Sequence, residues 1–127
     1  MPVTCEFDGT ALVVRLVGVY TLAEIRTAIA AALAEPRTRP LTGVLVDMRE
    51  SESVTMRTLG DITAIIGFLA YHGPSFGNRV AFLVAGDAQY AVARMATADL
   101  HTGGVAASVF HEAGEARRWL QPALGGN

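Results

Sequence analysis

The chain has 127 residues, of which 51% are hydrophobic and 17% charged, and its formal net charge is −2 at neutral pH. This length and composition suit one folded domain, residues 1–127, and argue against disorder. All ten basic residues are arginine, which excludes lysine nucleophiles, Schiff-base enzymes and phosphate-loop lysines. The absence of a basic run disfavours nucleic-acid binding.

The sequence also limits where the protein works. Its N-terminus has no basic segment followed by an apolar one, and no apolar run reaches the roughly 18 residues that span a bilayer. Cys5 is the single cysteine, so neither an internal disulfide nor a cysteine-based metal site can form. We expect a cytoplasmic protein with a structural thiol, without a signal peptide or membrane span.

The first segment predicts a β-hairpin. CEFDGTALVVRLVG alternates apolar and polar residues around Asp8-Gly9, a dipeptide that tolerates the positive φ angles of tight turns. The strands are expected from about Val3 to Phe7 and from about Ala11 to Val17. Because the turn is too short for a crossover, the first strand must be antiparallel to the second.

A helix follows the hairpin. Thr21 and Glu24 have the spacing of a capping box, and Tyr20 and Ile25 have that of a hydrophobic staple. Pro36 ends the helix. Five apolar residues recur at helical spacing on its buried side: Leu22, Ile25, Ile29, Ala32 and Leu33.

The rest of the chain alternates short apolar runs with helical segments. GVLVDMR is typical of a central parallel strand covered on both faces. The polar loop RESESVT leads into a helix from about Thr55 to Tyr71. NRVAFLVAG precedes a helix from Asp87, its expected N-cap, to about His101. VAASVF and EAGEARRWL form the last strand and helix.

The order β-β-α-β-α-β-α-β-α predicts an α/β fold. Its sheet is mixed, mostly parallel and five-stranded, with an antiparallel N-terminal edge strand, and it carries four helices. The segments GVLVDMR, NRVAFLVAG, AVARMA and VFHEAGEARRWL, in this order and spacing, resemble the SpoIIAA-like (STAS-like) family, which is related in fold to bacterial anti-sigma-factor antagonists. The resemblance covers nearly the whole chain and implies a small regulatory or binding domain.

The resemblance also implies a place to look for phosphoregulation. In phosphoregulated members, an acidic residue at a strand end is followed by an Asp-Ser-x-Gly type motif at the next helix start. Asp47 matches that strand end, but Thr55 and Met56 stand where Asp-Ser is expected. We therefore expect no intact phosphoswitch. Ser53, Thr55 and Thr58 remain possible phosphate acceptors near a helix N-terminus, with helix capping as the alternative.

Charged residues gather where the parallel strands are expected to end, the usual ligand-binding edge of an open α/β sheet. Asp47, Asp87 and His111 could form an acid/base group in a small enzyme. The alternative is that Asp87 caps a helix and its neighbours are solvated. His72 and His101 fall at helix C-termini, at the opposite end, so we expect no metal site. No nucleotide-binding or hydrolase motif is present, and no cofactor is expected.

The second helix holds more apolar surface than one sheet can cover. Leu59, Ile62, Ile66 and Leu69 form the stripe expected to face the sheet. Ile65, Phe68 and Tyr71 form a second stripe, and Gly60, Ala64 and Gly67 a third of small residues. The second stripe requires cover from its own chain, from a second subunit, or from an apolar ligand.

Three functions follow from this helix and the polar groups. The first is a non-enzymatic STAS-like module that binds a protein partner, as a homodimer through helix two, with RESESVT as a polar contact surface. The second is a carrier or sensor of an apolar, lipid-like ligand. The third is the enzyme that uses Asp47, Asp87 and His111.

Overall fold

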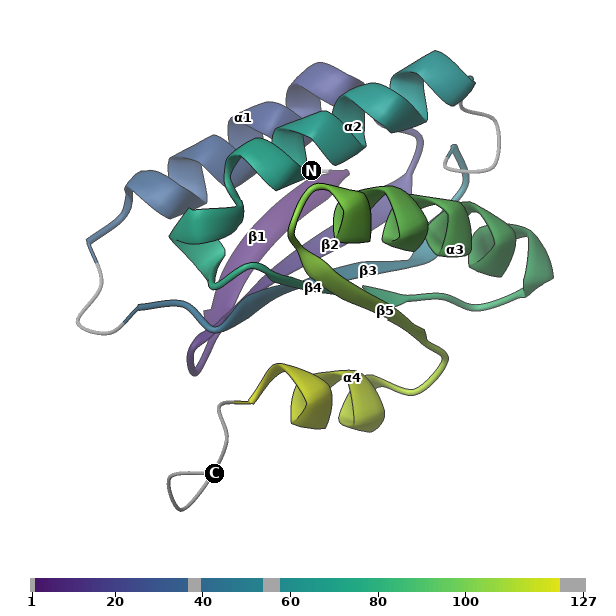
Figure 1. Ribbon diagram of the computed structural model, residues 1–127. Coiled ribbons are helices and arrows are strands. Elements are labelled where there is room, and N and C mark those ends of the chain that lie inside the picture. Colours follow the sequence, from purple (N-terminus) through teal and green to yellow (C-terminus); the bar gives the residue numbers. More distant parts are fainter. Residues whose placement is uncertain (1, 37–39, 54–57, 122–127) are drawn as a thin grey trace.

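Figure 1 shows the computed structural model, which describes residues 2–36, 40–53 and 58–121. In this part of the chain, strands and helices alternate after an N-terminal hairpin, as the sequence predicts. No helix there is long and apolar enough to cross a bilayer. The elements are β1 (Val3–Asp8), β2 (Ala11–Gly18), α1 (Leu22–Ala34), β3 (Gly43–Ser51), α2 (Leu59–Tyr71), the 3-10 helix η2 (Gly73–Phe76), β4 (Arg79–Leu83), α3 (Asp87–Thr102), β5 (Ala106–Phe110) and α4 (Ala113–Leu120).

The sheet has the strand order β1-β2-β3-β4-β5. β1 is antiparallel to β2, and every other neighbouring pair is parallel. The predicted fold class is therefore confirmed, including the antiparallel strand at the N-terminal edge. The hairpin loop is Gly9–Thr10, one residue later than predicted, because Asp8 already pairs with Ala11 and Gly9 adopts φ +61° at the first turn position.

The two faces of the sheet are covered unequally (Figure 1). Helices α1, α2 and α3 lie on one face, over a large apolar cluster that includes Val14, Val46 and Phe82. On the other face α4 packs alone, over a smaller cluster that includes Leu45 and Leu83. We call these the three-helix face and the α4 face. The alternation of side chains along each strand sends neighbouring residues to opposite faces.

Close approach of the backbone fixes the position of α4. A Cβ atom added at Gly43 would lie 2.5 Å from Cδ2 of Leu120, so glycine leaves room for this leucine to pack on β3. Arg79 Nη2 donates a hydrogen bond of 2.7 Å to the carbonyl oxygen of Trp119, and its guanidinium lies 4.2 Å from the centre of the Trp119 ring. The cation thus stabilises the C-terminal end of α4.

Several predicted boundaries are corrected. α1 begins after Thr21 with the predicted capping box complete. α2 begins at Leu59 with Thr58 as its N-cap, and the predicted start at Thr55 lies outside the described residues. Asp87 is not an N-cap: Gly86 occupies that position, and Asp87 stands in the first turn of α3.

β3 is longer than predicted. It continues to Ser51, so Asp47 lies within the strand and residues 49–51 of the expected polar loop are extended. The extension is held by Tyr20, whose hydroxyl lies 2.6 Å from Ser51 Oγ, and by Glu52 N, which donates to Gly18 O. These partners come from distant parts of the chain, which is why the local pattern did not predict it.

Candidate functional site

The sheet-facing side of α2 is as predicted for three of its four residues, and the side chain of Leu59 lies outside the described part of the structure. Ile62, Ile66 and Leu69 are buried in the large apolar cluster. Ile65 and Phe68 are half-buried and pack against the same cluster, on a helix that lies beside α1 (Figure 1). The second apolar stripe is therefore partly covered by its own chain.

Beyond Asp61 in its first turn, the outward side of α2 carries no charge. Gly60, Thr63, Gly67 and Tyr71 are exposed, and Ala64 is half-buried. Apart from its own helix turn, no described atom lies within 4 Å of a Cβ atom built at Gly67, so Gly67 does not serve packing against another described element. Tyr71 is 81% exposed, which is unusual for a large side chain on a helix with so little polar surface.

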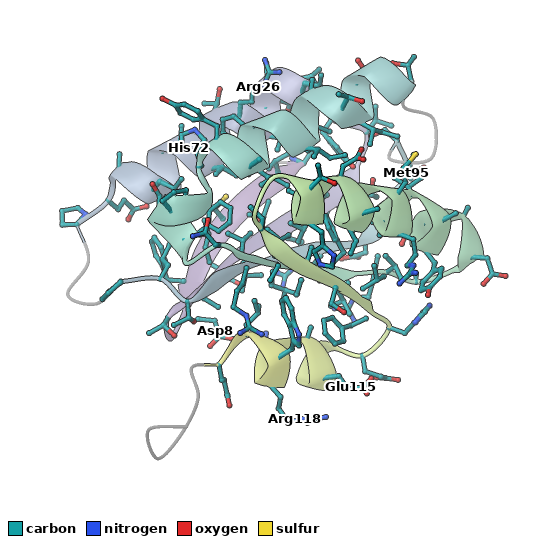
Figure 2. The ribbon with its side chains drawn as sticks, in the orientation of Figure 1. Asp8, Arg26, His72, Met95, Glu115 and Arg118 are labelled. Carbon is teal, nitrogen blue, oxygen red and sulfur yellow. The ribbon has the colours of Figure 1, made fainter. Side chains whose placement is uncertain are left out.

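Aromatic rings cluster at the C-terminal end of α2. The ring centres of Phe68 and His72 are 4.6 Å apart, and those of Tyr71 and His72 are 5.1 Å apart with the rings nearly perpendicular. Figure 2 labels His72 at this end of the helix. Edge-to-face contacts of this kind hold rings in place without a full covering of protein. We refer to Gly60, Ala64, Ile65, Phe68, Tyr71 and His72 as the α2 surface.

His72 was not predicted as part of this surface, because its place at a helix C-terminus was weighed only as a possible metal ligand. Its position four residues after Phe68 and one after Tyr71 was the available signal, since residues at i and i+4 meet on one side of a helix.

Asp47 is the centre of an ion-pair network on the α4 face. Its side chain is 7% exposed and accepts two hydrogen bonds of 3.0 Å, from Nε and Nη2 of Arg49. The backbone N–H of Arg49 donates a third, and Nε of Arg15 lies 3.8 Å from Oδ2 of Asp47. Arg15 also pairs with Glu6 at 3.8 Å. The sequence placed Arg49 near Asp47 at the strand end, but Arg15 was not predicted at this site, because it meets Asp47 only through the β2–β3 register.

This network keeps Asp47 ionised. Burial alone would raise the pKa of the Asp47 carboxyl, but the hydrogen bonds and positive charge of Arg49, with the charge of Arg15, lower the pKa below its ordinary value. A carboxylate held in this state is a poor proton acceptor near neutral pH. The negative charges of Glu50 and Glu112 also lie near Arg49. Because these carboxylates offset the positive charge of the arginine, the site does not favour an anionic ligand.

The other members of the proposed acid/base group lie in different surroundings. His111 is exposed, and its ring stacks on Tyr90 with centres 5.4 Å apart. Asp87 is exposed in the first turn of α3. No hydrogen bond joins His111 to Asp47 or Asp87 among the described residues.

The possible phosphate acceptors are also placed. Ser53 is buried, and Thr58 Oγ1 accepts a hydrogen bond from the backbone N–H of Asp61 as the N-cap of α2. Thr55 lies outside the described residues. The helix-capping interpretation is therefore confirmed for Thr58.

A cavity of about 400 Å³ lies beside the β1–β2 turn, at the end of the sheet opposite to Asp87 and His111. It is bordered by the β1–β2 turn and the end of α4, where Arg117 Nε lies 3.3 Å from Oδ2 of Asp8 (Figure 2). Thr10 and Thr42 add hydroxyl groups to its wall. Ala11 and Leu120 contribute apolar surface beside these polar groups, so the lining is mixed and differs from the predominantly apolar lining of a lipid site. Phe76 is fully buried in the core and is not available to line an apolar ligand site.

Other reactive groups are unremarkable in their surroundings. Burial, together with the negative charge of Glu35, raises the pKa of the Cys5 thiol to about 11, so the thiol is almost entirely protonated at neutral pH. Across residues 2–36, 40–53 and 58–121, no group of three or more His, Cys, Asp or Glu side chains is arranged to hold a metal ion.

The comparisons with known proteins bear on the fold. No protein-family model matches the chain, and no curated protein matches it. Among solved structures, it is similar to an uncharacterized protein of the DUF3478 family from Shewanella loihica PV-4, described as having a SpoIIAA-like fold. The TM-score is 0.62 at 21% sequence identity, over 94% of this chain and 92% of the other. Together with the strand order and helix placement, this likeness establishes that the chain has a SpoIIAA-like fold.

Proposed function

We propose that this protein is a non-enzymatic, regulatory binding module that contacts another protein through the α2 surface. The observation that carries the proposal is Tyr71, 81% exposed at the end of a helix side that carries no charge after Asp61. Exposed aromatic side chains next to half-buried ones are typical of the residues that dominate protein interfaces.

The α2 surface offers both apolar area and a polar contact. Full burial of a large apolar side chain stabilises a complex by roughly 1.5–3 kcal/mol. The hydroxyl of Tyr71 and the ring nitrogens of His72 can fix the orientation of a partner through hydrogen bonds. Exposed glycines at positions 60 and 67 let a partner backbone approach closely. A partner helix or loop with an apolar anchor fits this combination.

We propose a different protein as the partner here, although the sequence favoured a homodimer through helix two. The predicted homodimer depended on a second subunit covering Ile65, Phe68 and Tyr71, but Ile65 and Phe68 are partly covered within their own chain. What remains exposed is a narrow strip that ends in Tyr71. Such a strip suits a limited, reversible contact.

We further propose that binding is not controlled by phosphorylation at the β3–α2 connection. Ser53 is buried, so its hydroxyl is not presented to a kinase, and the exposed Thr58 already serves as the N-cap of α2. The enzyme alternative gains no support, because the Asp47 carboxylate is paired with Arg49 and the His111 ring stacks on Tyr90. The apolar-ligand alternative gains none from the cavity beside Asp8 and Arg117, whose lining includes a charged pair and two threonine hydroxyl groups.

Co-purification from the source cells tests the proposal. Wild type, Tyr71→Ser and Tyr90→Ser proteins carry the same affinity tag, and Tyr90 is the control because it is an exposed tyrosine on another helix, 38% exposed. We expect a stoichiometric partner with wild type and Tyr90→Ser, and its loss with Tyr71→Ser at unchanged melting temperature. Equal recovery of the partner by all three proteins contradicts the assignment to α2.

A further inference from the structure

The two edges of the sheet differ in how their backbone groups are used. At the β5 edge, Ala106 N donates to Asn78 O and Phe110 O accepts from Val84 N, so alternate residues of β5 bond to β4. The groups of Ala107 and Val109 therefore point outward. Nε2 of His101 lies 3.0 Å from the carbonyl oxygen of Ala107, so a side chain of α3 occupies the middle of this edge.

The β1 edge has no such cover. Val17 N donates to Pro2 O over 2.8 Å, and the antiparallel register alternates from that pair, so Thr4, Glu6 and Asp8 bond to β2. The N–H and C=O groups of Val3, Cys5 and Phe7 consequently point away from the sheet. Within the described residues, no side chain or backbone group is hydrogen-bonded to them there.

A row of outward donors and acceptors at two-residue spacing matches another extended backbone. The side chains of β1 favour a second copy of the same strand. In an antiparallel pair centred on Cys5, Val3 faces Phe7 of the second copy, and Thr4 faces Glu6 of the second copy. Centring the pair on Glu6 would set like charges opposite each other, and centring it on Thr4 would pair fewer of the outward groups.

We propose that β1 pairs with β1 of a second copy about a two-fold axis at Cys5, which joins the two sheets into one. Phe7, 38% exposed in the single chain, gains cover from Val3 of the second copy. This self-association uses neither Tyr71 nor the rest of the α2 surface, so it is independent of the proposed function.

The pairing also brings together the two copies of α1, which lies over β1 (Figure 1). Small residues occupy most of the exposed side of this helix, and Arg26 points away from the sheet (Figure 2). Helices with small side chains at their contact approach to about 8 Å. The small exposed residues of α1 are Ala23, Thr27, Ala30, Ala31 and Ala34.

Amide hydrogen exchange of wild-type protein tests the pairing directly. In a single chain the amides of Thr4 and Glu6 are bonded to β2, whereas those of Cys5 and Phe7 are open to water. We expect the protection of Cys5 and Phe7 to rise about tenfold or more between dilute and concentrated protein, in parallel with a dimer mass by light scattering. A monomeric mass at every concentration, with Cys5 and Phe7 unprotected, overturns the proposal.

Variants separate this dimer from one formed through α2. Phe7→Lys places a charge beside the β1 edge and is expected to give a folded monomer. Val19→Lys, at an exposed valine away from this edge, is the control and should remain dimeric. A dimer that persists in Phe7→Lys but is lost in Tyr71→Glu would assign self-association to the α2 surface and overturn the proposal. The wild-type exchange pattern decides the question even where a variant fails to fold.

Discussion

The three-helix face and the α4 face cover the same five strands by different physical means. On the three-helix face, apolar side chains from α1, α2, α3 and η2 form a continuous core in which Phe76 and Ile29 are almost completely buried. On the α4 face, a helix of eight residues packs near Gly43 and Arg79, mainly over β4 and β3. Over β2, the sheet is covered by the side chain of Arg15 and its ion-pair partners Glu6 and Asp47, in place of a helix.

The difference shows how a small domain can leave part of a sheet without a helix. The long apolar stems of arginine side chains cover strands while their guanidinium groups remain in water. Asp47 fixes Arg49 with two hydrogen bonds, so this cover is ordered. We therefore interpret the charged part of the α4 face as structural, and place recognition on α2 and on the β1 edge.

The largest expected effect of a substitution is on the three-helix face. Phe76→Ala removes a fully buried ring from the end of η2 and should lower the free energy of unfolding by about 3–5 kcal/mol, because it leaves a cavity in a close-packed core. Urea denaturation followed by circular dichroism measures the loss. A loss below about 1 kcal/mol would contradict the packing of η2 described above.

Leu120→Ala tests how strongly the packing of α4 on the sheet stabilises the fold. Leu120 is buried against Gly43, and its truncation should cost about 2–4 kcal/mol. The effect should stay below that of Phe76→Ala, since the smaller cluster has room to collapse and α4 stands at the end of the described chain. Exchange of α4 amides should accelerate more than exchange of α2 amides. Equal acceleration in both helices would mean that the two faces are not separate packing units.

Asp47→Asn tests whether the ion pairs of Asp47 stabilise the fold, and its effect on the free energy of unfolding should depend on pH. The variant should lose about 1–3 kcal/mol at pH 7, a range that allows for the partial exposure of both arginines. Because the folded-state pKa of Asp47 is lowered from 3.8, the unfolded chain takes up the proton first. Wild-type stability from this group is present above pH 3.8 and is lost as the pH falls further.

Denaturation series between pH 2.5 and pH 7 compare the two proteins, and the stability gap should narrow towards the acid end. A gap that stays constant over the whole series would show that the charge of Asp47 does not contribute.

The smallest effect is expected at Arg15. Arg15→Met keeps the apolar stem over β2 and removes a charge that lies 3.8 Å from each of two carboxylates, so stability should change by no more than about 0.5 kcal/mol. Arg15→Asp should cost clearly more, because it loses the stem and repels Asp47. Thermal melts of both variants provide the comparison. Equal losses in the two variants would contradict the role of the stem.

Much of the fold follows from local sequence patterns. The capping box at Thr21 and Glu24, the hairpin and the apolar runs predicted the element order and the parallel sheet, because these signals involve residues close in the chain. The length of β3 was missed, because Tyr20 and Gly18 hold its last residues from another part of the chain. The N-cap of α3 was misplaced by one residue, since Gly86 also accepts the extended conformation.

The candidate site was less predictable than the fold. Periodicity identified α2 as the helix with surplus apolar surface, but it could not tell which stripe would lie beside α1 and which would face water. The half-burial of Ile65 and the exposure of Tyr71 depend on how α1 and α2 pack. Which residues of β1 point their N–H and C=O groups away from β2 depends on which residue pair lies next to the turn. That pair is Asp8 and Ala11.

Site-specific photo-crosslinking in living source cells tests whether the α2 surface binds another protein. A photoreactive phenylalanine analogue replaces Tyr71 in one variant and Tyr90 in the matched control. We predict one discrete crosslinked product with a different protein from position 71 and none from position 90. Absence of a product at position 71, or the same products from both positions, would show that the α2 surface does not bind a specific protein partner.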